Sequence, residues 1–316
     1  MSAGSTGVRR AAVDVGTNSV RLLVIDEAGR TLVREMTITR LGRRVDDLGH
    51  LDDEALARTL DTIEGYSRLW SAHGVDRDHV RIAATSAVRD VSDADRFFAG
   101  VRERTGVEAR VLSGEQEART AFLGATRAFV LTTGVTVLDI GGGSTELVVG
   151  DAAGEVAGSV SLQLGSVRLT ERLLVSDPPT PRQLDAARAE IDRQLDRADQ
   201  VLGEQGIVVD AAGTLVGVAG TVTTIAALDL GLRTYEPEAI HGHVLSRDAV
   251  ARITAGLVAV PAARRAELGP IQPGREDVIH GGALILLGVL DHRGLDAVVV
   301  SERDILDGLA MAGCPG

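Results

Sequence analysis

Two short stretches of this sequence repeat each other, and the repeat constrains the fold more than any other feature. The stretch DVGTNS begins at Asp14, and the stretch DIGGGS begins 125 residues later at Asp139. The aspartate, the first glycine and the serine recur, and Leu22 matches Leu147 at the same offset. A chance likeness between two turns would explain the glycines but not the recurring Asp and Ser. We therefore interpret the repeat as a duplicated structural unit.

Each copy is followed by a similar succession of predicted elements. Short β-branched and apolar runs predict two strands around each glycine-rich turn, and then a third strand. Apolar residues at helical spacing predict the helices, with Asp52 or Asp53 and the pair Thr180-Pro181 as helix starts. The predicted strands cover 11–15, 20–26, 31–40, 80–88, 108–113, 135–140, 146–149, 155–164, 215–218 and 297–301. The predicted helices cover 52–72, 93–105, 115–129, 221–230, 247–258, 275–291 and 305–311, with a long one from 180.

The chain is long enough for two hydrophobic cores. It has 316 residues, of which 44% are hydrophobic. We expect a first domain over 1–130 and a second over 131–301, with the final helix in 302–316 packing back on the first. Residues 1–8 are expected to form a loose tail without the features of a secretory signal. No apolar run approaches the ~20 residues needed to cross a membrane, so a membrane partner is not expected.

Charge and cysteine content narrow the classes of partner and site. The single cysteine, Cys314, excludes an intrachain disulfide and a cysteine metal cluster, and suits a reducing cytoplasm. The net charge of −12 disfavours binding to nucleic acid. A phosphate-rich substrate would therefore need local attraction from backbone N–H groups, arginines and a divalent cation. The sequence contains no lysine, and Arg suits bidentate contact with phosphate.

The first glycine-rich stretch has the composition of an anion-binding turn. Gly16 would let backbone N–H groups approach an anion closely. Thr17, Asn18 and Ser19 could donate to phosphate oxygens. Asp14 would repel a phosphate unless a Mg²⁺ ion lay between them, which makes it a candidate metal ligand. On its own, the stretch is equally well explained as a hairpin turn with a capping Asp.

The second stretch supports the same interpretation more strongly. Three consecutive glycines cost backbone entropy without adding packing, so close approach of an anion is the expected reason for them. Asp139 and Glu146 flank the turn and are candidates to hold a metal ion or orient a water molecule. A solvated edge carboxylate is the ordinary explanation of Glu146. The residues expected to contact phosphate are Gly141, Gly142, Gly143, Ser144 and Thr145.

Two further segments lie at the ends of predicted strands. Gly217, Gly220 and Thr221 stand where a strand turns into a helix, and a helix N-terminus attracts anions. A plain N-cap by Thr221 is the simpler alternative. Arg89 follows the strand 80–88, at the end where open α/β folds place ligands. We expect Arg89 to contact phosphate, with a surface ion pair as the alternative.

The stretch SGEQEAR, from Ser113, opens a predicted helix with two carboxylates. Acidic side chains in a first turn are favoured by the helix dipole, which explains both without any catalytic role. Alternatively, one of them takes the proton of an attacking water, as hydrolysis of a phosphoanhydride requires. The spacing alone does not choose between Glu115 and Glu117.

Together these motifs resemble the exopolyphosphatase/guanosine pentaphosphate phosphohydrolase (Ppx/GppA) family. The resemblance spans about residues 11–290, almost the whole chain. It implies an α/β fold of two RNase H-like domains flanking a cleft, as in the actin-like, sugar-kinase-like superfamily. The stretches that carry it are AAVDVGTNSVRLLV, ATSAVR, LSGEQEAR, LDIGGGSTELVV, LQLGSVRLTE, GVAGTVTT and GREDVIHGGALIL.

The same resemblance implies roles for single residues. Glu117 corresponds to the proposed catalytic base, and Asp139 and Glu146 correspond to an acidic pair near the attacking water and a Mg²⁺ or Mn²⁺ ion. Arg89 corresponds to an arginine thought to contact the substrate. The family's phosphate-binding loops correspond to Asp14 with Thr17, Asn18 and Ser19, to Gly141–Thr145, and to Gly217–Thr221.

The sequence departs from the family pattern in two places. Residues 91–93 are VSD where Ala-x-Asn is usual, and residues 304–309 are DILDGL where Gly-Leu-Arg-x-Gly-Leu is usual. Longer members also continue beyond the last residue of this chain. We therefore expect short polyphosphates or a distributive mode of action.

The expected function is a Mg²⁺-dependent exopolyphosphatase in the cytoplasm. The terminal phosphate would lie between the Asp14 and Asp139 loops, and Glu117 would deprotonate the attacking water. Inorganic polyphosphate is the expected partner, with guanosine penta- or tetraphosphate as an alternative substrate or an inhibitor. A homodimer is also expected. The alternatives are a guanosine pentaphosphate hydrolase, a non-catalytic sensor of alarmone or polyphosphate, and a kinase of the same superfamily.

Overall fold

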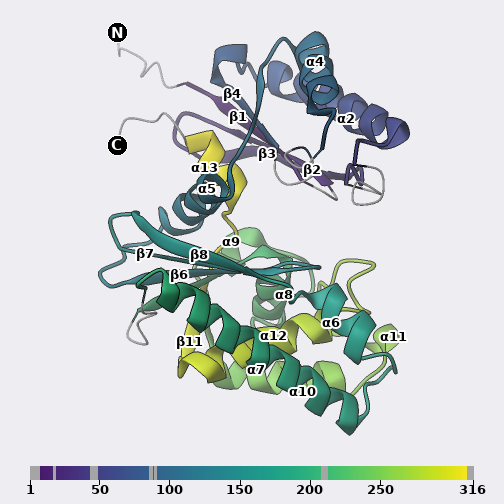
Figure 1. The fold of residues 1–316 in the computed structure, drawn as a ribbon, viewed down its shortest axis with the longest axis vertical. Coiled ribbons are helices and arrows are strands. Elements are labelled where there is room, and N and C mark those ends of the chain that lie inside the picture. The colour runs from purple at the N-terminus through teal and green to yellow at the C-terminus, as the bar shows by residue number, and fades with distance from the viewer. Residues whose placement is uncertain are drawn as a thin grey trace. The chain divides into compact units, whose positions relative to one another are not determined.

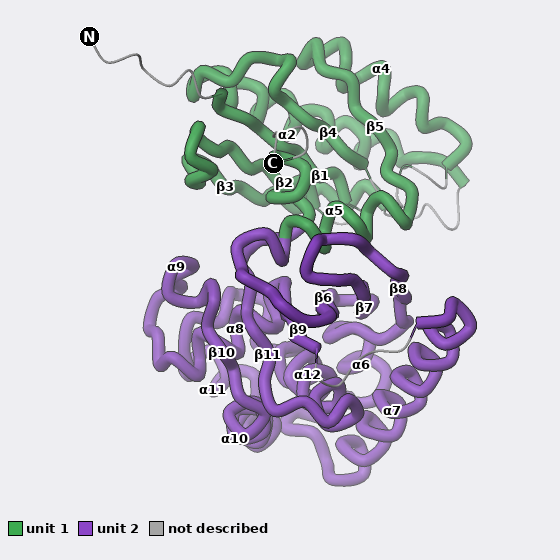
Figure 2. Tube along the Cα trace, turned by 90° about the vertical axis from the view of Figure 1, so that its left-hand side faces the viewer, with its two compact units in different colours: residues 1–124, 305–316 green, residues 125–304 purple. Residues whose placement is uncertain are grey.

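The computed structural model describes residues 8–16, 19–42, 49–84, 88, 91–207 and 213–311. The chain divides into two compact units, one of residues 1–124 and 305–316 and the other of residues 125–304 (Figure 2). We propose that these units are the two domains expected from the sequence. No helix within the described residues combines the length and the apolar character needed to cross a membrane.

The first unit is built on a five-stranded sheet in the order β3-β2-β1-β4-β5. The strands β1, β2 and β3 are antiparallel neighbours, and β4 and β5 continue the sheet in parallel with β1. Helices α2 and α4 cover one face, and α5 and α13 lie on the other (Figure 1). The bounds are Arg10–Val15 (β1), Ser19–Ile25 (β2), Thr31–Ile38 (β3), Asp53–Ala72 (α2), Arg77–His79 (η1), Val80–Ala84 (β4), Ala94–Thr105 (α4), Ala109–Val111 (β5), Gly114–Thr126 (α5) and Ile305–Met311 (α13).

The second unit is built on a six-stranded sheet in the order β10-β11-β9-β6-β7-β8. Helices α6, α7, α10 and α12 lie on one side of this sheet in Figure 1, and they share its hydrophobic core. The strands are Val135–Ile140 (β6), Thr145–Gly150 (β7), Val156–Leu162 (β8), Thr214–Val218 (β9), Val244–Ser246 (β10) and Ala297–Val300 (β11). The helices are Ser166–Leu173 (α6), Pro181–Glu204 (α7), Ala219–Asp229 (α8), Pro237–Ile240 (α9), Arg247–Val258 (α10), Ala262–Arg265 (α11) and Ile279–Arg293 (α12).

The two sheets repeat one topology. The order β8-β7-β6-β9-β11 in the second unit matches β3-β2-β1-β4-β5 in the first, with the second strand of each antiparallel to its neighbours. This is the RNase H-like arrangement, and it confirms the predicted fold class. The predicted cleft between the domains stays a prediction.

The repeat extends to the turns. The N–H of Gly16 donates to Ser19 O at 2.9 Å, and that of Gly141 donates to Ser144 O at 3.0 Å. A further identity at the same offset, Asp26 and Asp151, begins the next turn in each copy. Each of these carboxylates accepts the backbone N–H groups two and four residues later. The duplicated sequence therefore folds into duplicated local geometry.

Most predicted elements are present close to their predicted bounds. Asp52 caps α2 by accepting from Ala55 N, and Thr180 forms a capping box with Gln183 at the start of α7. Two bounds were wrong. The strand predicted over 80–88 ends at Ala84, and Val88 is already helical. The helix predicted from Arg275 begins at Ile279, because the preceding residues form hydrogen-bonded turns.

Candidate active site

The first glycine-rich loop joins β1 to β2 and places two opposite charges side by side. Asp14 is only 5% exposed and lies directly across from Arg21 in the antiparallel pair. The Arg21 Nη2 and Nε atoms donate to Asp14 Oδ2 at 2.7 and 3.1 Å. Arg21 thus already supplies positive charge to this carboxylate. A metal-binding role for Asp14 stays a prediction, and Thr17 and Asn18 lie outside the described residues.

The second loop joins β6 to β7 and places two like charges side by side. Asp139 and Glu146 are cross-strand partners, at the register that Asp14 and Arg21 have in the first sheet. Both side chains are half-buried. Ser161 Oγ donates to Glu146 Oε1 at 2.8 Å and fixes one oxygen of that carboxylate.

The Asp139 and Glu146 carboxylates have the chemistry of ligands for a divalent cation. Like charges directly opposite each other on antiparallel strands destabilise a sheet, and a cation would relieve that repulsion. Mg²⁺ is commonly held by one or two carboxylates and completed by water and substrate phosphate oxygens. No group of three or more His, Cys, Asp or Glu side chains in the described part of the chain is placed to hold a metal. Asp139 and Glu146 are therefore residues that could hold Mg²⁺ together with substrate.

The tip of the second loop is open to solvent. Gly142 and Gly143 are exposed, whereas Gly141 and Ser144 are half-buried. Thr145 is fully buried, and its Oγ1 donates to Leu164 O at 2.5 Å. The Thr145 hydroxyl therefore anchors the loop to the end of β8. The phosphate contacts expected of the loop stay a prediction.

The third predicted loop joins β9 to α8 and contains a strained residue. Ala219 has a φ of 64°, in the left-handed region that favours glycine. The next residue, Gly220, lies so close to the Arg275 guanidinium that a Cβ there would overlap it. Thr221 is buried against Gly282 of α12. A cation thus lies over the first turn of α8, where the helix dipole already favours an anion.

Arg275 is a candidate that the motif analysis missed as a single residue. The sequence pattern predicted Arg275 as the first residue of the helix 275–291. In the structure it lies in a turn before α12, half-buried against Gly220. The stretch GRED was part of the family resemblance, and it was the available signal.

A polar cluster supports the same end of the second sheet. The Tyr235 hydroxyl donates to Glu302 Oε1 at 2.5 Å and lies 2.7 Å from Thr223 Oγ1 of α8. Burial and the neighbouring Glu302 carboxylate raise the pKa of Tyr235. The hydroxyl therefore stays protonated and ties the segment after β11 to α8.

The helix α5 carries the two candidate bases in different environments. Ser113 and Gln116 form a reciprocal cap, with Gln116 N donating to Ser113 Oγ at 3.2 Å and Ser113 N to Gln116 Oε1 at 3.0 Å. Glu115 points to solvent, whereas Glu117 is half-buried. The two carboxylates thus differ in exposure, and the role of Glu117 as the catalytic base stays a prediction. Arg89, the remaining candidate in this unit, lies outside the described residues.

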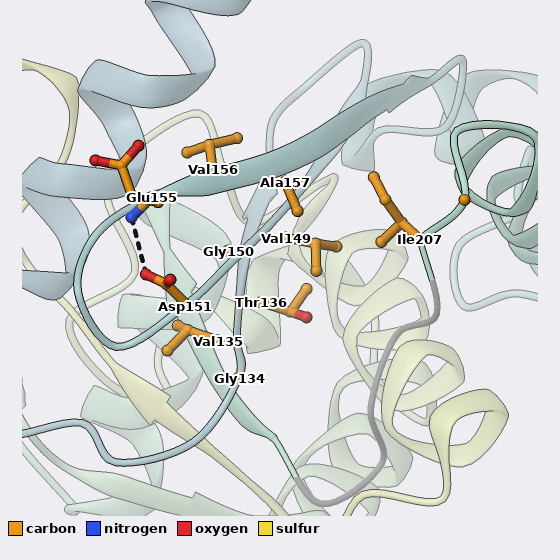
Figure 3. A pocket seen from close by; sticks show the side chains of 11 residues that line it. Gly134, Val135, Thr136, Val149, Gly150, Asp151, Glu155, Val156, Ala157 and Ile207 are labelled. Atoms are coloured by element: carbon orange, nitrogen blue, oxygen red, sulfur yellow. Dashed lines mark hydrogen bonds between the residues drawn. The ribbon is translucent and has the colours of Figure 1, made fainter.

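A hollow of about 390 Å³ lies at the other end of the second sheet (Figure 3). Val135 at the start of β6 and Val156 at the start of β8 line it, while the glycine loop follows the last residue of β6. Asp151 borders the hollow, and its carboxylate accepts from Glu155 N at 2.9 Å. This hollow is therefore separate from the candidate phosphate loops.

Comparison with known proteins identifies the family. Residues 23–312 match the model of the Ppx/GppA phosphatase family.

The chain belongs to the Ppx/GppA phosphatase family.

As a Ppx/GppA protein, the chain is a member of a hydrolase family. It is 38% identical to exopolyphosphatase 2 of Mycobacterium tuberculosis, over 96% of this chain and 98% of that protein. It is 31% identical to a bifunctional 3-dehydroquinate synthase/phosphatase of Fusobacterium nucleatum, where it covers 46% of the longer protein.

Solved Ppx/GppA structures share the whole fold. The crystal structure of the type II variant of the Aquifex aeolicus Ppx/GppA phosphatase has a TM-score of 0.88 at 29% identity, covering 98% of this chain and all of that one. A nucleoside triphosphate hydrolase from Neospora caninum has a TM-score of 0.54 at 13% identity, which shows the fold alone. The chain thus shares its α/β fold with solved members of the Ppx/GppA family.

Proposed function

We propose that this Ppx/GppA protein is an exopolyphosphatase that releases orthophosphate from the end of inorganic polyphosphate, short chains above all. One observation carries the proposal. Beside the three-glycine loop two carboxylates, Asp139 and Glu146, face each other, where the first copy has the neutralised pair Asp14 and Arg21. An acidic pair beside a phosphate-type loop is suited to a metal-bound polyphosphate, and the 38% identical exopolyphosphatase 2 supports that substrate.

The proposed reaction is hydrolysis of one phosphoanhydride bond. Glu117 accepts a proton from a water molecule, whose oxygen forms a bond to the terminal phosphorus. The bond from that phosphorus to the bridging oxygen breaks, and its electron pair stays on the shortened chain. Backbone N–H groups of the Gly141–Thr145 loop, the first turn of α8 and Arg275 would hold the phosphate oxygens. Thr17–Ser19 and Arg89 are proposed to make further contacts.

Asp139 and Glu146, with Asp14 as a third candidate, would hold the metal ion. A bound Mg²⁺ would offset the negative charge of the phosphate oxygens. Replacing Glu146 by Gln should raise the Mg²⁺ concentration needed for half-maximal activity by about tenfold or more, because one carboxylate ligand is lost. The exposed Glu171→Gln serves as the control and should leave it unchanged.

Phosphate release from purified protein tests the activity. Tripolyphosphate, long polyphosphate and guanosine pentaphosphate are compared with and without Mg²⁺. We expect the fastest release from the short polyphosphate and none without the metal. Faster release from guanosine pentaphosphate would assign the alternative substrate, and binding without any release would indicate a sensor. A cytoplasmic location and a homodimer stay predictions.

A pair of matched variants tests the base. Glu117→Gln should lower kcat by a factor of about 10²–10⁴, the range of general base catalysis, while binding of polyphosphate persists. Glu115→Gln, two residues earlier on the same helix and exposed, should keep wild-type turnover. Near-wild-type turnover of Glu117→Gln would exclude Glu117 as the base.

A further inference from the structure

The carbonyl groups of the second glycine loop are held from one side by the start of α6. Gly141 O accepts from Ser166 N at 2.9 Å and from Ser166 Oγ at 3.2 Å. Gly142 O accepts from Val167 N at 2.9 Å and from Arg168 N at 3.1 Å. Three successive carbonyls are fixed in this way, because Gly143 O accepts from Arg168 Nε at 2.6 Å.

The direction of these carbonyls sets the direction of the neighbouring N–H groups. The peptide bonds of the loop are trans, and a trans peptide points its N–H opposite to its C=O. The N–H groups of Gly142, Gly143 and Ser144 therefore point away from α6. Gly142 and Gly143 are exposed, so these groups open toward solvent on the free side of the loop. Successive N–H groups with a common direction form an anion-binding concavity.

Gly165 permits this close contact. It is buried directly before α6, and a Cβ at this position would overlap Gly142 O. It would also lie 2.6 Å from the Gly143 carbonyl carbon, closer than a real Cβ approaches backbone. Any larger residue would push α6 and the loop apart. The stretch LQLGSVR thus contains the glycine that permits the close contact, the start of α6 and the arginine that binds the loop from the side of α6.

We propose that Gly165 and Arg168 are positioning residues that orient the second glycine loop for phosphate binding. Arg168 holds the peptide of Gly143 through its Nε atom, and Gly165 lets the first turn of α6 hold the peptides before it. Both act through the loop rather than on the substrate. This inference rests on the proposed function for its kinetic test, and its structural test is independent of turnover.

Direct contact between Arg168 and phosphate is the competing explanation, and two substitutions separate the two roles. In Arg168→Gln the amide Nε2 stands where the arginine Nε stood, so the donor to Gly143 O is kept while the charge is lost. Arg168→Met has a similar length with neither donor nor charge. Orientation of the loop predicts that Gln retains activity and Met does not. Direct charge contact predicts that both lose it alike.

The kinetic experiment measures kcat and KM for tripolyphosphate with Mg²⁺. We expect kcat/KM to fall by about 10- to 100-fold in Arg168→Met, the scale of a misplaced binding group, and by less than about threefold in Arg168→Gln. The exposed Arg172, one turn later on α6, provides the control, and Arg172→Met should behave as wild type. Equal losses in the Gln and Met variants, or wild-type values in Arg168→Met, would overturn the proposal.

A second substitution tests the contact at Gly165. Gly165→Ala should lower kcat/KM by about 100-fold, since the loop must move away from α6. Gly203→Ala, in α7 with open space at its Cβ, is the matched control and should keep wild-type activity. Wild-type kcat/KM in Gly165→Ala would contradict the proposal.

An NMR measurement keeps the test separate from the proposed activity. Protein labelled with ¹⁵N-glycine is titrated with tripolyphosphate and Mg²⁺, and the Gly142 and Gly143 amide signals are followed. They should shift in wild type and Arg168→Gln but not in Arg168→Met. If no substrate is hydrolysed but these signals shift in this pattern, the proposed function fails and the positioning role stands. Unshifted wild-type signals would remove the positioning role.

Discussion

Arg21 donates to Asp14 Oδ2 through two nitrogen atoms, at 2.7 and 3.1 Å, from the strand directly opposite. The equivalent position in the second unit is Glu146, opposite Asp139. One copy of the duplicated hairpin has thus a neutral pair, and the other concentrates negative charge. Because the backbone register is the same, Arg21 and Glu146 occupy equivalent positions, and the better candidate metal pair lies in the second unit.

Removing Arg21 should destabilise the first unit. Arg21→Met deletes the cation beside a carboxylate that is 5% exposed, and we expect a loss of about 3 kcal/mol in the free energy of unfolding. Urea unfolding measures it. Arg30→Met should cost much less, because the Arg30 side chain is exposed and the buried Asp26 carboxylate keeps the backbone N–H groups of residues 28 and 30 as donors. The double variant Asp14→Asn/Arg21→Met should recover most of the loss, and a double variant as unstable as Arg21→Met would refute this account.

A side chain at Gly308 should push α13 away from α5, the helix that carries Glu117. A Cβ on Gly308 of α13 would overlap the carbonyl oxygen of Thr120 on α5, one turn beyond Glu117. Gly308→Ala should therefore cost about 1–3 kcal/mol and lower kcat. Gly256→Ala in α10, where the Cβ meets open space, should be neutral or slightly stabilising. Thermal unfolding and phosphate release are measured on both variants. Equal stabilities of Gly308→Ala and Gly256→Ala would contradict the packing argument.

Ala219→Gly should stabilise the protein. Ala219 has a φ of 64°, and a left-handed conformation costs an alanine roughly 1 kcal/mol that glycine avoids. The expected gain is about 0.5–1 kcal/mol in urea unfolding. The exposed Ala186 in α7 is the control, where the same change should cost about 1 kcal/mol. A loss of stability in Ala219→Gly would mean that the turn does not have this backbone conformation.

His280 should make stability depend on pH. It is 2% exposed on α12, and burial, with Arg265 nearby, lowers its pKa from 6.5 to about 4. The unfolded chain therefore binds a proton more readily between these values. The contribution of neutral His280 is complete above pH 6.5 and is lost as the pH falls toward 4, by about 3 kcal/mol in all.

Unfolding free energies at pH 7 and pH 4.5 test this dependence. In His280→Leu, the unfolding free energy should differ between the two pH values by much less than in the wild type. In His50→Leu, at an exposed histidine, the difference should be the same as in the wild type. An unchanged pH dependence in His280→Leu would show that another group is responsible.

The local sequence pattern was sufficient to predict the hairpins and the long helices. The strands around Asp14 and Asp139 and the caps at Asp52 and Thr180 depend on residues close in the chain, so periodicity and capping chemistry predict them. The short elements α6, α9, β10 and α11 were missed, because three to eight residues carry too few periods to be recognised. The end of β4 and the start of α12 were misplaced. The predicted strand was continued beyond Ala84 to the apolar Val88, and the predicted helix included the charged residues 275–277, which precede α12.

The sequence by itself determined the duplicated α/β fold, the family and the list of candidate loops, because these follow from motifs and near-neighbour patterns. The register of the first hairpin, which places Arg21 opposite Asp14, also depends on residues close in the chain. The pairing of these two side chains was nevertheless not predicted. Only the tertiary structure decided which side chains support those loops. Arg275 over Gly220 and Arg168 behind Gly143 join residues that are 55 and 25 positions apart. Such contacts depend on how helices pack where glycines leave room, and no periodicity within one element encodes that.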